Sequence, residues 1–122
     1  MKYIFSFLLI FSIASSCNDD DIEDVFCTDI YVYGLNVTVR DASNNEILKE
    51  GITVIAKEGF YTEELMVTDS QDNFFGAGER QGIYIITVTG EGYETFVSET
   101  ITVSGDVCHV FPESSEVFLV PN

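Results

Sequence analysis

The stretch YVYGLNVTVR, residues 31–40, carries the pattern from which the fold of this chain is predicted. Apolar and aromatic residues occupy every second position of it: Tyr31, Tyr33, Leu35, Val37 and Val39. Polar residues fall between them at Asn36, Thr38 and Arg40. Because successive side chains of a strand point to opposite faces, this alternation predicts a half-buried β-strand.

Strand-like segments continue on the C-terminal side of this stretch. GITVIAK, residues 51–57, places Ile52, Val54 and Ala56 on one face, after the turn-forming sequence DASNNE at 41–46. Further candidates lie at residues 60–68, 74–77, 82–90, 93–103 and 116–120, with the turn DSQDN at 69–73. No window has ten residues of helical apolar spacing. Short strands at regular spacing predict an all-β sandwich or barrel with seven to eight strands.

The N-terminus has the features of a secretory signal peptide. Lys2 precedes a short apolar run, and the small residues Ser15 and Ser16 lead into Cys17. The run is too short for a membrane-spanning helix. The sequence ASSC at 14–17 resembles a bacterial lipobox, which implies that residues 1–16 are removed and that Cys17 is lipidated. Ordinary cleavage, with Cys17 as a free thiol, is the alternative.

An acidic segment, NDDDIEDV at 18–25, follows Cys17. Clustered like charges repel, so residues 17–26 are predicted to be the lipidated cysteine and a hydrated tether to the membrane. The acids also resemble the signal that exports some lipoproteins to the outer face of the outer membrane. We therefore expect a lipid-anchored, surface-exposed protein, with a periplasm-facing anchor as the alternative.

The two remaining cysteines are Cys27 and Cys108. Disulfides persist in an oxidising compartment outside the cytoplasm, so these residues are predicted to form one. The alternative is a pair of buried free thiols. Residues 27–122 are long enough for one domain. The net charge of −16 excludes a nucleic-acid partner, because nucleic-acid binding depends on Lys and Arg.

Three segments resemble carboxypeptidase regulatory-like domains. They are GLNVTVRDASNNEILKEGITVIAK at 34–57, TDSQDNFFGAGERQGIYIITVTGEGYETF at 68–96 and CHVFPESSEVFLVP at 108–121. The resemblance implies a Greek-key β-sandwich of the transthyretin-like (prealbumin-like) type, with Cys108 on a strand before the last one. In that fold Gly90 and Gly92 bracket a turn, and Tyr84 and Tyr93 are expected at the edge of the core with their hydroxyls hydrogen-bonded.

The residues do not favour catalysis. His109 is the only histidine, and its neighbour Cys108 is expected in a disulfide, so neither a Cys–His nucleophile nor a His-ligated zinc site is predicted. Asp69 and Asp72 share one turn and are weak candidates for calcium ligands. No cofactor is expected. The leading prediction is a non-catalytic binding or assembly module for an unidentified protein or glycan, such as a glycan-capture or transporter-accessory protein; an adhesin-like envelope spacer and a calcium-binding domain are the alternatives.

Overall fold

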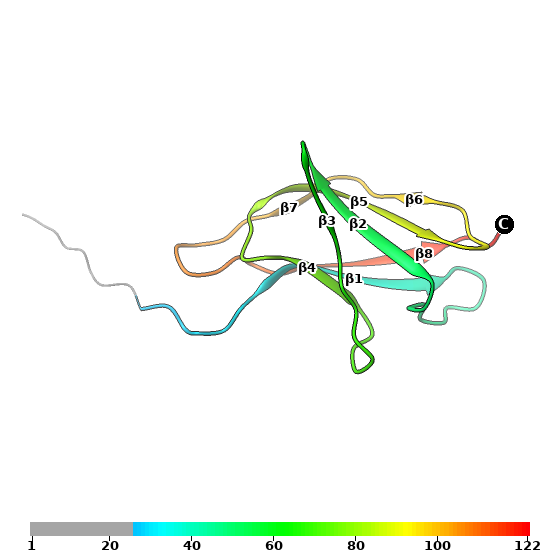
Figure 1. Ribbon diagram of the computed structural model, residues 1–122, viewed down its shortest axis with the longest axis horizontal. Coiled ribbons are helices and arrows are strands. Elements are labelled where there is room, and N and C mark those ends of the chain that lie inside the picture. The colour runs from blue at the N-terminus through cyan, green and yellow to red at the C-terminus, as the bar shows by residue number, and fades with distance from the viewer. Residues whose placement is uncertain (1–25) are drawn as a thin grey trace, which may run out of the picture.

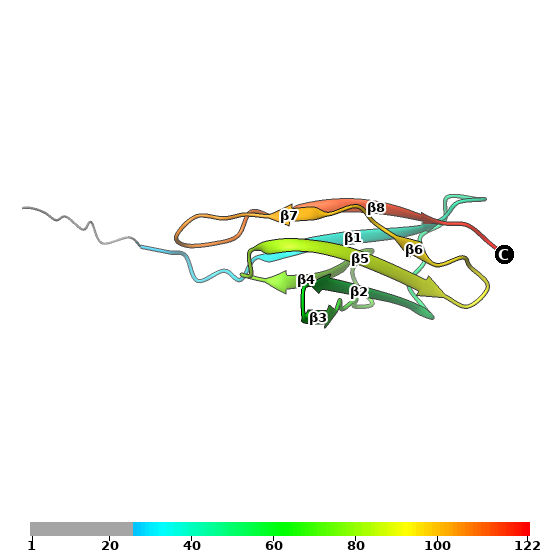
Figure 2. The same ribbon diagram turned by 90° about the horizontal axis from the view of Figure 1, so that it is seen from above.

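A computed structural model describes residues 26–122 of the chain. The predicted signal peptide, Cys17 and nearly all of the predicted acidic tether lie outside the described residues. The described part is all-β, and its strands form two sheets that lie one above the other (Figures 1 and 2). It contains no helix long and apolar enough to cross a membrane.

Eight strands are assigned within residues 26–122. They are β1 (Tyr33–Asp41), β2 (Ile52–Glu58), β3 (Tyr61–Glu64), β4 (Phe74–Gly78), β5 (Gly82–Gly90), β6 (Phe96–Val97), β7 (Ile101–Val103) and β8 (Glu113–Leu119). The all-β prediction is confirmed, and β2 and β5 match their predicted segments closely.

The smaller sheet has the strand order β4-β1-β8, and the larger has the order β3-β2-β5-β6, with β7 also paired to β5. β1 and β8 run parallel, whereas β1–β4 and all pairs of the larger sheet are antiparallel. The first and last strands of the domain are therefore neighbours, and β8 stands at the end of its sheet.

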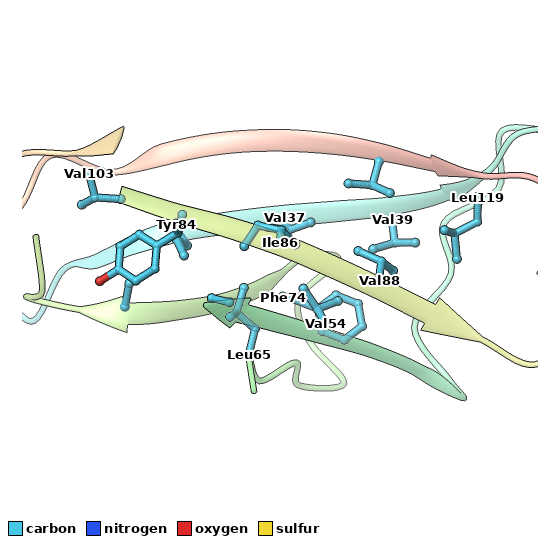
Figure 3. Packing of buried hydrophobic residues seen from close by; sticks show 14 of the residues in the cluster. Val37, Val39, Val54, Leu65, Phe74, Tyr84, Ile86, Val88, Val103 and Leu119 are labelled. Atoms are coloured by element: carbon cyan, nitrogen blue, oxygen red, sulfur yellow. The ribbon is translucent and has the colours of Figure 1, made fainter. Parts of the chain in front are cut away.

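The core fills the space between the two sheets (Figure 3). β1 contributes Leu35, Val37 and Val39, and the facing β5 contributes Tyr84, Ile86 and Val88, all of them buried. Each set occupies alternate positions of its strand, so the period-two pattern directs apolar side chains inward from both sheets. Burial of this apolar surface is the main stabilising contribution to the fold.

The predicted alternation of residues 31–40 is wrong at its N-terminal end. Gly34 and Leu35 are both buried, and a Cβ on Gly34 would lie 2.6 Å from Cγ1 of Val103. The chain therefore changes face at Gly34. Tyr33 lies instead with Phe75, on the outer side of the smaller sheet, and Tyr31 precedes the strand and is 61% exposed.

The predicted strand at 93–103 is interrupted. Ser98 Oγ accepts a hydrogen bond from the backbone N–H of Ile86 at 2.8 Å, where a regular ladder would use a backbone carbonyl. Because the Ser98 hydroxyl takes the place of the backbone acceptor, the strand ladder is broken here and β6 is separated from β7. Only residues 61–64 of the predicted strand at 60–68 form β3.

The predicted strand at Cys108 is wrong too, because Cys108 lies in a turn. Asp106 Oδ1 accepts hydrogen bonds from the backbone N–H groups of Cys108 and His109 at 2.9 and 3.0 Å. A short polar side chain that bonds to the backbone two and three residues ahead favours a turn over a strand.

Candidate functional site

A cleft of about 450 Å³ opens on the outer side of the smaller sheet. β1 and β4 supply Tyr33, Asn36 and Phe75, and the loop between β3 and β4 supplies Thr68, Ser70, Gln71 and Asn73. The lining thus combines two aromatic rings with three amides and three hydroxyls, one of which belongs to Tyr33. None of these side chains is charged at neutral pH, although the chain as a whole has a net charge of −16.

The aromatic rings form a connected cluster beside the cleft. The centroids of Tyr33 and Phe75 lie 4.7 Å apart with an interplanar angle of 58°, and Tyr31 meets Tyr33 edge-on at 5.2 Å. The ring of Tyr31 lies against Gly78, where any Cβ would collide with it. Such ring pairs have favourable geometry, so the cluster holds the aromatic wall in place.

Two of the three amides of the cleft, Asn36 and Asn73, are held by hydrogen bonds to the backbone. Asn36 Nδ2 donates to the carbonyl of Tyr33 at 3.1 Å and to that of Glu113 at 3.4 Å. Asn73 Nδ2 donates to the carbonyl of Phe74 at 3.3 Å and lies 3.5 Å from Asn36 Oδ1. These bonds orient the amides of Asn36 and Asn73 before any ligand arrives, which reduces the entropy lost on binding.

Lys49 holds the loop that completes the cleft. Its Nζ donates to the backbone carbonyls of Thr68, Asp69 and Gln71 at 3.1, 3.2 and 2.5 Å. An ammonium therefore occupies the carbonyl-lined side of the turn that contains the candidate calcium ligands Asp69 and Asp72. Asp69 and Asp72 are exposed, and no group of three His, Cys, Asp or Glu residues suited to a metal occurs within residues 26–122.

Cys27 and Cys108 form a disulfide, with a Cα–Cα distance of 5.2 Å and a sequence separation of 81 residues. The bond joins the segment before β1 to the loop between β7 and β8. The predicted pairing is therefore confirmed.

His109 reinforces this junction. Its Nδ1 lies 2.6 Å from Glu79 Oε2, and its Nε2 lies 3.0 Å from Oγ1 of Thr28. Glu79 also accepts the backbone N–H groups of Val32 and Val110 at 2.9 and 3.0 Å. Burial acts to raise the pKa of Glu79, but the hydrogen bonds from His109 and the two backbone groups outweigh it and lower the pKa.

His109 stands out in the sequence as the only histidine, whereas no sequence pattern distinguishes Glu79 from the other acidic residues. Glu79 has a positive φ of 50°, which is unusual for a residue other than glycine. Its position after β4 brings its carboxylate between the segment before β1 and the loop before β8. No local pattern in the sequence indicates this, because the three segments meet only through strand pairing.

The hydroxyls of Tyr84 and Tyr93 are hydrogen-bonded, as predicted. The Tyr84 hydroxyl accepts from Arg80 Nη1 at 2.8 Å and donates to the Arg80 carbonyl at 3.0 Å. The Tyr93 hydroxyl donates to Asp41 Oδ2 at 2.6 Å. Hydrogen bonds from Ser43 and Tyr93 lower the pKa of Asp41. Gly92 adopts a positive φ of 88° in the turn before Tyr93, which glycine tolerates best.

Neither a protein-family model nor a curated protein matches the sequence. The chemistry of the cleft is therefore the basis for a functional assignment.

Proposed function

We propose that this chain is a non-catalytic outer-membrane lipoprotein that captures a glycan in the cleft between β1, β4 and the β3–β4 loop. Cys17 carries the lipid, residues 17–26 form the tether, and the domain is exposed on the cell surface. We assign the domain to the carboxypeptidase regulatory-like group, with a Greek-key, transthyretin-like topology. The three sequence segments that resemble that group support this assignment.

The lining of the cleft carries the functional proposal. An aromatic ring offers an apolar face to the C–H groups of a sugar, and amides and hydroxyls can both donate and accept hydrogen bonds with sugar hydroxyls. Tyr33 and Phe75 supply the rings, and Asn36, Gln71 and Asn73 supply the amides. The volume lies within the range of small-ligand sites, which is roughly 300–1,000 Å³.

The electrostatics favour a neutral saccharide. A lining without charged side chains offers no partner for a carboxylate, sulfate or phosphate on the ligand. The net charge of −16 would also repel an anionic polymer as it approaches. A neutral glycan avoids both costs.

Binding of the purified lipoprotein in detergent to an array of neutral and anionic glycans tests the proposal. We expect Tyr33→Ala to weaken binding to the best neutral glycan about tenfold, because a stacked ring contributes about 1.4 kcal/mol. Phe60→Ala is the matched control, since Phe60 is a fully exposed aromatic residue that does not line the cleft. Equal effects of the two substitutions, or no glycan bound, would contradict the proposal.

A structural role as an envelope spacer is the second candidate. The described chain begins at one end of the domain, and its C-terminus lies at the opposite end (Figure 1). The Cys27–Cys108 disulfide secures the tethered end. A spacer would bind none of the glycans on the array. Substitutions in the cleft, such as Tyr33→Ala, would not change how well the spacer holds its partner.

A further inference from the structure

One edge of β8 faces β1, and the other edge is not paired with any strand of the described residues. Within a strand, the backbone N–H and C=O groups of successive residues point alternately to the two sides. The carbonyls of Glu113 and Leu119 accept from Asn36 Nδ2 and from the N–H of Ala42, on the side of β1. Odd-numbered residues of β8 therefore face β1, and Ser114, Glu116 and Phe118 face away from it.

The continuation of the chain agrees with this assignment. The carbonyl of Val120 accepts from Glu94 at 2.8 Å, and the N–H of Asn122 donates to Gly92 at 2.9 Å, both on the side away from β1. For Ser114, Glu116 and Phe118, no backbone partner occurs among residues 26–122. An edge with three such residues at alternate positions can pair with an added strand.

A slot of about 200 Å³ opens beside this edge. Its floor contains the core residues Val37, Ile86 and Val117, and its far wall is formed by the chain from Phe96 to Ile101. The slot exists because Ser98 interrupts the strand opposite β8, so the larger sheet does not close over the core there. It has room for an apolar side chain.

We propose that the β8 edge and this slot bind an extended, basic segment of a partner protein, which adds to the smaller sheet as a further strand. Its backbone would pair with Ser114, Glu116 and Phe118, and one apolar side chain would enter the slot. This interaction uses main-chain hydrogen bonds for affinity and the pocket for specificity.

Charge identifies the partner as basic. Glu99 stands at the far wall of the slot, and it has no ion pair among the described residues. The net charge of −16 attracts Lys and Arg over a longer range. A second copy of this chain is disfavoured, since antiparallel pairing of two β8 strands about their centre would set the two Glu116 side chains opposite each other, and like charges repel across strands. Arg40 of the same chain, 3.2 Å from Glu116, reduces this repulsion only in part.

The probe is a fluorescent nine-residue peptide, KVTVKVTVK, titrated into the full-length lipoprotein in detergent and followed by anisotropy. We expect saturable binding, with slower hydrogen exchange at residues 113–119. Ser114→Pro should weaken binding at least tenfold, because it removes an outward N–H from the edge. It should leave the melting temperature nearly unchanged, since that N–H does not bond to β1.

A charge reversal provides an independent test. Glu99→Lys should weaken binding of the lysine peptide, whereas the acidic peptide EVTVEVTVE should bind neither the wild type nor the variant, because both stay strongly acidic. Glu91→Lys is the matched control, because Glu91 is exposed and does not line the slot. The proposal is overturned if the lysine peptide does not bind, if Glu91→Lys has the same effect as Glu99→Lys, or if β8 is protected by dimerisation alone.

Discussion

Replacement of both bridging cysteines, Cys27→Ser with Cys108→Ser, should destabilise the domain strongly. The disulfide closes a loop across 81 positions of sequence, which is most of the domain. In the loop-entropy account, a loop of this length contributes roughly 4 kcal/mol by restricting the unfolded chain. For a domain of about 100 residues, that loss lowers the melting temperature by on the order of 20 °C.

The folded state should change little in this variant. The hydrogen bond of 3.0 Å between Thr28 and His109 joins the same two segments as the disulfide and remains available. The core between the sheets does not involve either cysteine. The variant should therefore keep its β-rich circular dichroism spectrum and differ mainly in stability.

Urea unfolding, followed by circular dichroism with and without reductant, measures the effect. Reductant should destabilise the wild type by the same amount as the double substitution and should leave the double variant unchanged, which is the control. The wild type unfolded without reductant should expose no reactive thiol from this pair. Two reactive thiols, or a loss of unfolding free energy below about 1 kcal/mol where about 2–5 kcal/mol is usual, would contradict this prediction.

Three further predictions concern the anchor, the acidic turn and the junction at Glu79. Cys17→Ala should abolish labelling by an alkyne fatty acid and membrane fractionation; a variant that stays labelled would contradict lipidation. Calcium and magnesium at matched ionic strength should stabilise the protein equally and slightly, because the ammonium of Lys49 already occupies the carbonyls of the turn; a rise of several degrees with calcium alone, abolished by Asp72→Asn, would contradict this. The pKa of Glu79 lies below its ordinary value of 4.5, so the folded state binds fewer protons than the unfolded state. The contribution of Glu79 to the free energy of unfolding is therefore present above pH 4.5 and is lost as the pH falls through the folded-state pKa. The melting-temperature advantage of the wild type over Glu79→Gln should therefore shrink in acid, and an advantage independent of pH would count against the ionised contact.

Local pattern predicted most of the fold. In β2 and β5 the buried residues occupy every second position, as the period of a strand requires, and the residues between them are half-buried or exposed, including the apolar Ile83 and Ile85 of β5. The errors fall where a tertiary contact overrides the pattern. Val103 fills the space beside Gly34, and the β1 alternation changes face there, while the side chain of Ser98 replaces a backbone acceptor and divides the strand that the pattern made continuous.

The all-β class and the pairing of Cys27 with Cys108 could be predicted without coordinates, because strand alternation is a local property and the cysteines can be counted in the sequence. The position of Tyr33 beside Phe75 in a cleft, and the contact of Lys49 with the β3–β4 loop, became visible only in the folded chain. The same is true of the free edge of β8. These features depend on which strands pair and in which register, and that choice depends on the burial of the whole core rather than on any single segment.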